Sequence, residues 1–130
     1  NVLTSDGTDW TSAAAAGGAD TSLSNLTATG EQMVCKAWIN FNGTGTIAIR
    51  DSYNVSSITD AGTGNYRIFY SNNMANANYS CTAGHTTGTT TNPTSASLVE
   101  TATSYCRIVN YQGSNVGFDS SLQMVHVFGD

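Results

Sequence analysis

The sequence predicts an all-β protein folded as an antiparallel β-sandwich. Charged residues make up only 10% of the 130 residues, against about 25% in an ordinary globular domain. Ser, Thr, Asn and Gly take their place, and these residues favour turns and are poor helix formers. Several segments also alternate apolar and polar residues with the period of two that is typical of strands. We therefore expect six or seven strands, no helix, and a neutral surface of hydroxyl and amide groups.

The chain divides into two parts of different character. Residues 1–30 are predicted to form an extended N-terminal arm or linker, because most of this stretch lacks apolar periodicity. Its start is the exception: Asp6-Gly7 is a tight-turn signal, with Val2 and Leu3 before it and Trp10 after it. We expect a short hairpin there, and a β-sandwich domain over residues 31–130.

The clearest strand signals lie in the first half of the predicted sandwich. Every second residue is apolar from Met33 to Phe41, which indicates a half-buried strand. Residues 47–55 are predicted to follow as a strand, and residues 56–59 either extend it or start another. A glycine-containing loop is expected over 60–65. The apolar residues predicted to share a face are Ile47, Ile49, Tyr53 and Val55 in the second strand, and Tyr66, Ile68 and Tyr70 in the third.

The second half is predicted to hold a strand near Tyr79–Cys81, another over residues 105–111, and a last one over 122–128. Residues 84–97 contain no large apolar side chain and are predicted to form a long polar loop. The last strand is apolar on both faces, which indicates an inner strand packed on two sides. His126 occupies an apolar position in it, so we expect a core or interface imidazole.

The three cysteines are Cys35, Cys81 and Cys106. Their spacing contains no CxxC or CxxH element, so the sequence predicts no zinc site. They are interpreted as small buried apolar residues of strands. One disulfide with a free thiol is the alternative.

Charge and motifs exclude several function classes. The four basic residues are interpreted as scattered, without the positive patch that nucleic-acid binding requires. No apolar run reaches the length of about 18 residues that a membrane helix needs. No nucleophile motif or paired-carboxylate signature stands out, so we expect no enzyme, no metal and no cofactor. The basic residues are Lys36, Arg50, Arg67 and Arg107.

Two stretches resemble proteins of tailed bacteriophages. VLTSDGTDWTSAAAAGG, residues 2–18, resembles a repeat-like linker phrase of tail fibre and virion structural proteins. Residues 36–80 resemble a C-terminal tail-fibre domain, and WINFNGTG at 38–45 is the most specific part. The closing VHVFGD, residues 125–130, resembles the last strand and chain end of that family. Residues 81–104 match no part of the family.

The resemblance implies the C-terminal tip domain of a homotrimeric fibre, located on the virion and exposed outside the cell. Its implied partners are a bacterial surface glycan or outer-membrane protein, and other phage tail proteins on the N-terminal side. It implies neither catalysis nor a cofactor, and it supplies no receptor-contacting residues. A passive collar or baseplate-fibre domain is the alternative. A polysaccharide depolymerase is a third hypothesis, although the long β-helix and clustered carboxylates of such enzymes are not visible.

Sugar recognition relies on aromatic faces and on planar amides or hydroxyls, which this chain has in number. The unmatched middle segment is predicted to carry specificity. Exchanging residues 84–97 for a Gly/Ser loop is then expected to abolish binding without unfolding the domain. The candidate receptor-binding residues are His85, Asn92, Tyr111 and Gln112.

Overall fold

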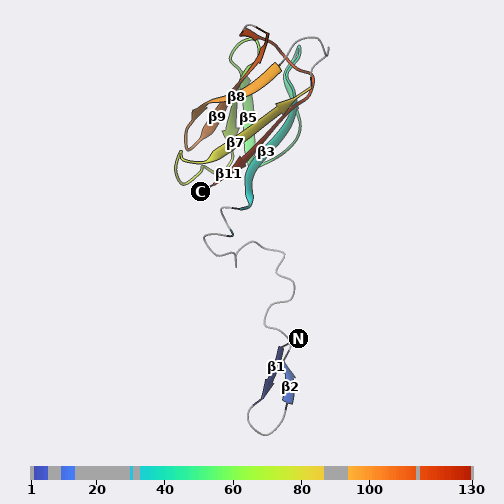
Figure 1. The fold of residues 1–130 in the computed structure, drawn as a ribbon, viewed down its shortest axis with the longest axis vertical. Coiled ribbons are helices and arrows are strands. Elements are labelled where there is room, and N and C mark those ends of the chain that lie inside the picture. Colours follow the sequence, from blue (N-terminus) through green and yellow to red (C-terminus); the bar gives the residue numbers. More distant parts are fainter. Residues whose placement is uncertain are drawn as a thin grey trace.

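The described residues form an all-β fold, as predicted (Figure 1). The structure is a computed structural model, and it describes residues 2–5, 10–13, 30, 33–86, 94–113 and 115–129. Nine strands build the sandwich and two form the N-terminal hairpin, which exceeds the six or seven expected. The strands are β1 (Val2–Ser5), β2 (Trp10–Ala13), β3 (Cys35–Asn42), β4 (Ala48–Tyr53), β5 (Val55–Asp60), β6 (Asn65–Tyr70), β7 (Ser80–His85), β8 (Thr94–Thr101), β9 (Tyr105–Gln112), β10 (Val116–Gly117) and β11 (Gln123–Phe128).

The predicted hairpin is confirmed. Strands β1 and β2 pair antiparallel, with Ser5 opposite Trp10 and Val2 opposite Ala13. The Asp6-Gly7 turn and residues 14–29 of the predicted arm lie outside the described residues.

Two antiparallel sheets pack face to face. One has the order β4-β3-β11-β7. In the other, β9 pairs with β8 and with β6, β6 pairs with β5, and the short β10 pairs with the end of β9. Their inner faces share one core, which consists of Ala37, Ile39, Phe41, Tyr66, Ile68, Tyr70, Met74, Tyr79, Cys106, Ile108, Val125 and Val127.

The period-two signals in β3 and β6 predicted the core correctly. Ala37, Ile39 and Phe41 are all at most 2% exposed, and the predicted face of β6 is buried as well. Burying an Ile or Phe side chain stabilises the fold by about 1.5–3 kcal/mol. The alternation does not extend to Met33, which precedes β3 and is exposed.

The expected strand over residues 47–55 is wrong, because the chain changes sheets at Asn54. This residue has a φ of 54°, a left-handed conformation that Asn tolerates better than most residues. Its amide donates to the carbonyls of Lys36 and Asn72. Strand β4 therefore ends in one sheet and β5, which holds residues 56–59, begins in the other. Ile49 and Tyr53 are exposed instead of sharing a buried face with Val55.

The predicted polar loop over residues 84–97 is also wrong at both ends. Gly84 and His85 belong to β7 and pair with β11, while residues 94–97 belong to β8 and pair with β9. Strand ends this polar escape a search for apolar patterns, because their pairing with β11 and with β9 places them in the sheets. The Gly/Ser exchange over 84–97 would place weak strand formers in both pairings, so a loss of binding in that variant would need a check that the domain is still folded. Residues 87–93 lie outside the described part.

Strand β11 is an inner strand, as predicted, because β3 and β7 flank it. Among the described residues, however, only one of the two faces of this strand is covered. Val125 and Val127 are buried, whereas Met124 and Phe128 are half-buried and His126 is exposed. The prediction of a core imidazole is therefore wrong for His126. The alternative, an imidazole at an interface between chains, is part of the assembly proposed below.

The interpretation of the cysteines as small buried apolar residues of strands is confirmed in full only for Cys106. All three thiols are free, Cys106 is fully buried, and Cys35 and Cys81 are half-buried. Cys81 also packs against the core.

The hydroxyl of Tyr66 ties two loops to the core. It lies 2.8 Å from a carboxylate oxygen of Asp119 and 3.1 Å from the carbonyl oxygen of Gly43. The backbone N–H of Gly64 donates to the same Asp119 oxygen at 2.7 Å. Burial, together with the Asp119 carboxylate, raises the pKa of Tyr66 above its usual value of 10. The hydroxyl therefore stays protonated and able to donate near neutral pH.

Tyr66→Phe should lower the free energy of unfolding by about 1–3 kcal/mol, since it removes a buried donor and leaves both acceptors in place. The matched control is Tyr111→Phe, which removes a hydroxyl that makes no hydrogen bond to the described residues from a half-buried side chain. Urea unfolding followed by tryptophan fluorescence compares the two. Equal midpoints would show that the Tyr66 hydroxyl does not stabilise the loops.

Candidate functional site

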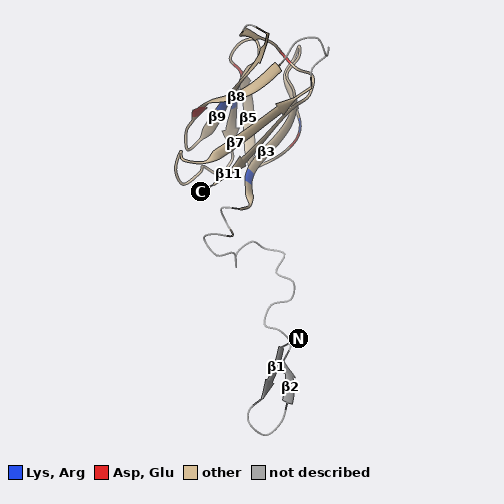
Figure 2. Ribbon diagram, in the orientation of Figure 1, with Lys and Arg blue, Asp and Glu red and all other residues tan. Residues whose placement is uncertain are grey.

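Charged side chains are sparse on the sandwich (Figure 2), yet two of the four basic residues lie side by side. Arg67 of β6 and Arg107 of β9 are direct cross-strand partners. They are far apart in the sequence, and the antiparallel pairing of β6 and β9 brings them together. The interpretation of the basic residues as scattered is therefore wrong for these two.

Both arginines point to the outer side of the β8-β9-β6-β5 sheet. In β6 the buried residues alternate with Asn65, Arg67 and Phe69. In β9, Cys106, Ile108 and Asn110 are buried and the alternate residues Tyr105 and Arg107 are half-buried. We call this surface the arginine face, and it comprises Asn65, Arg67, Phe69, Glu100, Tyr105 and Arg107.

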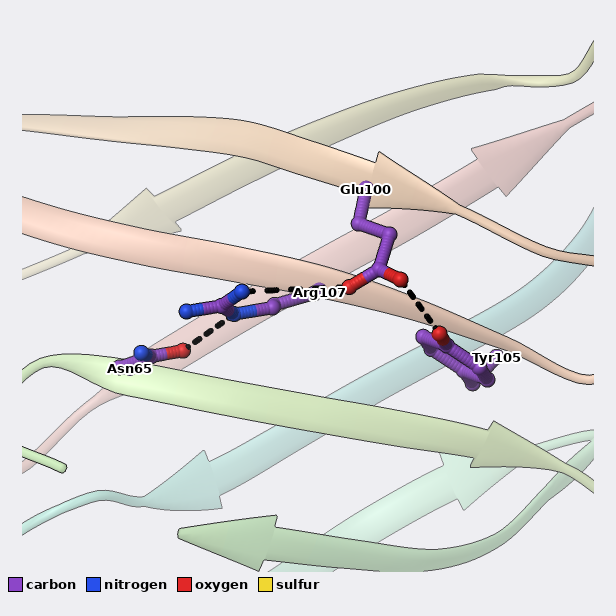
Figure 3. Close-up of polar contacts among 4 residues, drawn as sticks. All are labelled: Asn65, Glu100, Tyr105 and Arg107. Carbon is purple, nitrogen blue, oxygen red and sulfur yellow. Dashed lines mark hydrogen bonds and ion pairs between the residues drawn. The ribbon is translucent and has the colours of Figure 1, made fainter. Parts of the chain in front are cut away.

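Arg107 is held from both sides (Figure 3). Its Nε donates to Oδ1 of Asn65 at 2.8 Å, and its Nη1 lies 3.9 Å from Oε2 of Glu100. The other oxygen of Glu100 accepts a 2.5 Å hydrogen bond from the Tyr105 hydroxyl. This bond to Glu100 raises the pKa of Tyr105 above its usual value. The ion pair is too long and too exposed to add much stability, so its main effect is to orient the guanidinium.

Arg67 has a different environment. Its guanidinium carbon lies 5.7 Å from the centre of the Tyr105 ring, within the range of a cation–π contact. On the same face the Phe69 ring packs against the Tyr105 ring, with 5.4 Å between the two centroids. Among the described residues, no acceptor forms a hydrogen bond with the buried Nε of Arg67. The glutamate of this face, Glu100, forms its ion pair with Arg107 instead.

The arginine face therefore carries positive charge that its own described side chains do not balance. Two arginines and one glutamate leave one net positive charge on it, within a chain of net charge -5. Like charges directly opposite each other on neighbouring strands repel. Such an arrangement, with planar guanidinium donors beside aromatic rings, is suited to binding an anion.

The four predicted recognition residues are placed as follows. His85 is the last residue of β7, where its ring packs edge-on against Phe118 at 5.0 Å between centroids, and burial lowers its pKa. Tyr111 is half-buried on the same side of β9 as Arg107, and Gln112 follows it at the strand end. Asn92 lies outside the described residues. Among the described contacts none joins His85, Tyr111 and Gln112 to one another, so their receptor role stays a prediction.

The arginine face was missed because its members come from three strands. Strand alternation already predicts that the alternate positions occupied by Arg67 and by Arg107 face away from the core. What the sequence does not contain is the register that places these two positions opposite each other.

The other sheet has an outer face of a different kind, which we call the Trp38 face. Pairing across β4, β3, β11 and β7 sets Tyr53, Trp38, His126 and Thr82 in one row. Half-buried Met124 and Phe128 point to the same side of β11 as His126. This face combines aromatic and aliphatic groups with an imidazole.

The described residues contain neither a group of three metal-binding side chains nor a helix long and apolar enough to cross a membrane. Comparison with family models, curated proteins and solved structures finds no match.

Proposed function

We propose that this chain is the tip domain of a homotrimeric bacteriophage tail fibre, exposed on the virion, that binds a surface glycan of the host cell during adsorption. The resemblance of residues 2–18 and 36–80 to tail-fibre sequences supports the fibre identity. The observation that carries binding is the arginine face, where unbalanced positive charge lies beside two aromatic rings on an otherwise nearly neutral surface.

The Trp38 face is the proposed contact with the two sister chains. A sister chain packed on this face would cover the second face of β11, as the apolar residues on both faces of that strand predict. Strand β3, which contributes Trp38, is also the first strand after the predicted arm, so this face belongs to the part of the domain that follows a fibre shaft in the sequence. The arm would join the domain to other phage tail proteins.

The composition suits such a role. A fibre tip meets media of differing salt content, and exposed ion pairs weaken as ionic strength rises. A surface of hydroxyl and amide groups depends little on such pairs.

The native mass of the purified chain tests the assembly, and we expect three copies per particle. His126→Arg should dissociate them, because it would bury an unpaired charge between chains. Ser71→Arg adds the same charge at an exposed residue outside both faces and should leave the mass unchanged. A monomeric wild-type particle would contradict the trimer.

Binding is tested by adsorption to bacteria. Fluorescently labelled protein should bind cells of a strain panel, and extracted surface polysaccharide should compete with it. A trimer that binds no cell would favour the passive virion component. Release of reducing ends from the polysaccharide would instead favour a depolymerase.

A further inference from the structure

We propose that the arginine face binds a carboxylate-bearing sugar, such as a hexuronate of an acidic surface polysaccharide. This inference rests on the proposed function and names the chemical class of its receptor.

Charge balance points to a monoanion. The face has one net positive charge, from Arg67 and Arg107 less Glu100. A single carboxylate neutralises it, whereas a doubly charged phosphate would leave an excess negative charge beside Glu100. Because the whole chain has a net charge of -5, this local charge is the feature that attracts an acidic glycan.

The geometry of the donors fits a carboxylate as well. The planar guanidinium of Arg67 donates no described hydrogen bond, and its central carbon lies 5.7 Å from the centre of the Tyr105 ring. Arginine binds carboxylates through two parallel N–H donors, which gives short, directional bonds. Arg107, fixed by Asn65 and Glu100, adds a second positive group at the neighbouring position.

The remaining groups suit the sugar ring. Tyr105 and Phe69 present half-buried rings tilted by 47°, and the negative faces of such rings attract the weakly positive C–H groups of a sugar. The side chains of Asn65 and Glu100 offer oxygen acceptors for sugar hydroxyls. A neutral saccharide would use these groups but would leave Arg67 without a partner.

The alternative occupant is an acidic residue of a sister chain. It is disfavoured because burying both arginines in an interface would cost more than their pairing returns unless every donor were satisfied. The Trp38 face, on the opposite sheet, offers an apolar surface for that contact.

Calorimetric titration of the full chain with a galacturonate oligosaccharide tests the inference. The matched ligand is the same oligosaccharide with methyl-esterified carboxylates, which keeps the sugar and removes the charge. We expect binding of the acid form, weakening with added salt, and at least tenfold weaker binding of the ester. Inorganic phosphate should compete poorly. Equal affinity for acid and ester, or stronger competition by phosphate, would overturn the proposal.

Arg67→Gln should weaken binding of the acid form by about tenfold or more, because it replaces a charge-assisted interaction with a neutral one. The control Lys36→Gln removes an equal charge from β3, in the other sheet, and should leave binding unchanged. Arg67→Gln should fold, since it relieves repulsion with Arg107, and urea unfolding checks this. Arg67→Lys keeps the charge without the planar donor pair and should also bind less tightly.

The outcomes separate this inference from the proposed function. A trimer that binds cells but does not distinguish acid from ester would overturn the carboxylate assignment alone. A loss of the trimer in Arg67→Gln, seen in the native mass, would assign the arginines to a sister chain and overturn it too. A monomer that binds neither cells nor saccharide would instead refute the proposed function itself.

Discussion

Gly64→Ala is expected to destabilise the domain by about 3 kcal/mol, from about 1–2 kcal/mol of left-handed backbone strain and a further 1–3 kcal/mol of steric overlap. Gly64 has a φ of 70°. An added Cβ would lie 2.7 Å from the carbonyl oxygen of Phe118 and 2.8 Å from that of Asn110. Both are backbone atoms, and the Gly64 carbonyl itself accepts from the N–H of Asn110. The overlap therefore cannot be relieved by rotating a side chain.

Gly45→Ala is the matched control. Its φ of 62° is nearly the same, but a Cβ there would meet nothing within 4 Å. Gly45→Ala should lower the free energy of unfolding by the backbone strain alone, about 1–2 kcal/mol. Urea unfolding of both variants measures the difference. Equal losses would mean that the backbone at Asn110 and Phe118 can move away from Gly64 at little cost.

The effect at Gly64 also bears on the candidate site. Asn65 follows it directly and holds Arg107 through the 2.8 Å hydrogen bond from Nε. A shift of the β5–β6 loop would therefore move one of the two groups that orient the guanidinium. Backbone packing at the end of the sandwich thus supports the geometry of the arginine face.

The sequence predicted the buried face of a strand where the strand's own apolar and polar residues alternate. The alternation in β3 and β6 identifies their buried faces because the period of two decides which side chains face the core. It failed at Asn54, since a single left-handed residue redirects the chain without interrupting the apolar pattern. It failed again at residues 94–97, because β8 has few apolar side chains of its own and is fixed by its pairing with β9.

The arginine face could not be predicted from the sequence for a related reason. Glu100 and Arg107, which form the ion pair, are only seven residues apart in the sequence. Asn65 and Arg67 come from β6, and only the register of β6 on β9 brings them next to Arg107. A composition with few charges hides such a site further, because four basic residues spread along 130 positions look unrelated. The tail-fibre resemblance supplies no receptor residues that would have drawn attention to it.

Phe41→Ala is expected to lower the free energy of unfolding by about 3–5 kcal/mol, the usual cost of emptying a buried aromatic site. Phe41 has no exposed surface, and its ring meets that of Tyr66 edge-on at 5.1 Å between centroids. The cavity would open beside the Tyr66 ring, whose hydroxyl contacts Asp119 and Gly43. The loss therefore extends from the core to the loops at that end of the sandwich.

Ile49→Ala provides the comparison, because Ile49 is the cross-strand partner of Phe41 in β4 but is 38% exposed. In a single chain it should cost less than about 1 kcal/mol, since much of its surface already meets water. Urea unfolding at several protein concentrations separates the two cases. A loss from Ile49→Ala that approaches the loss from Phe41→Ala and grows with protein concentration would place the edge strand β4 under a sister chain. A small loss at every concentration would instead leave β4 outside the contact between chains and confine that contact to β3, β11 and β7.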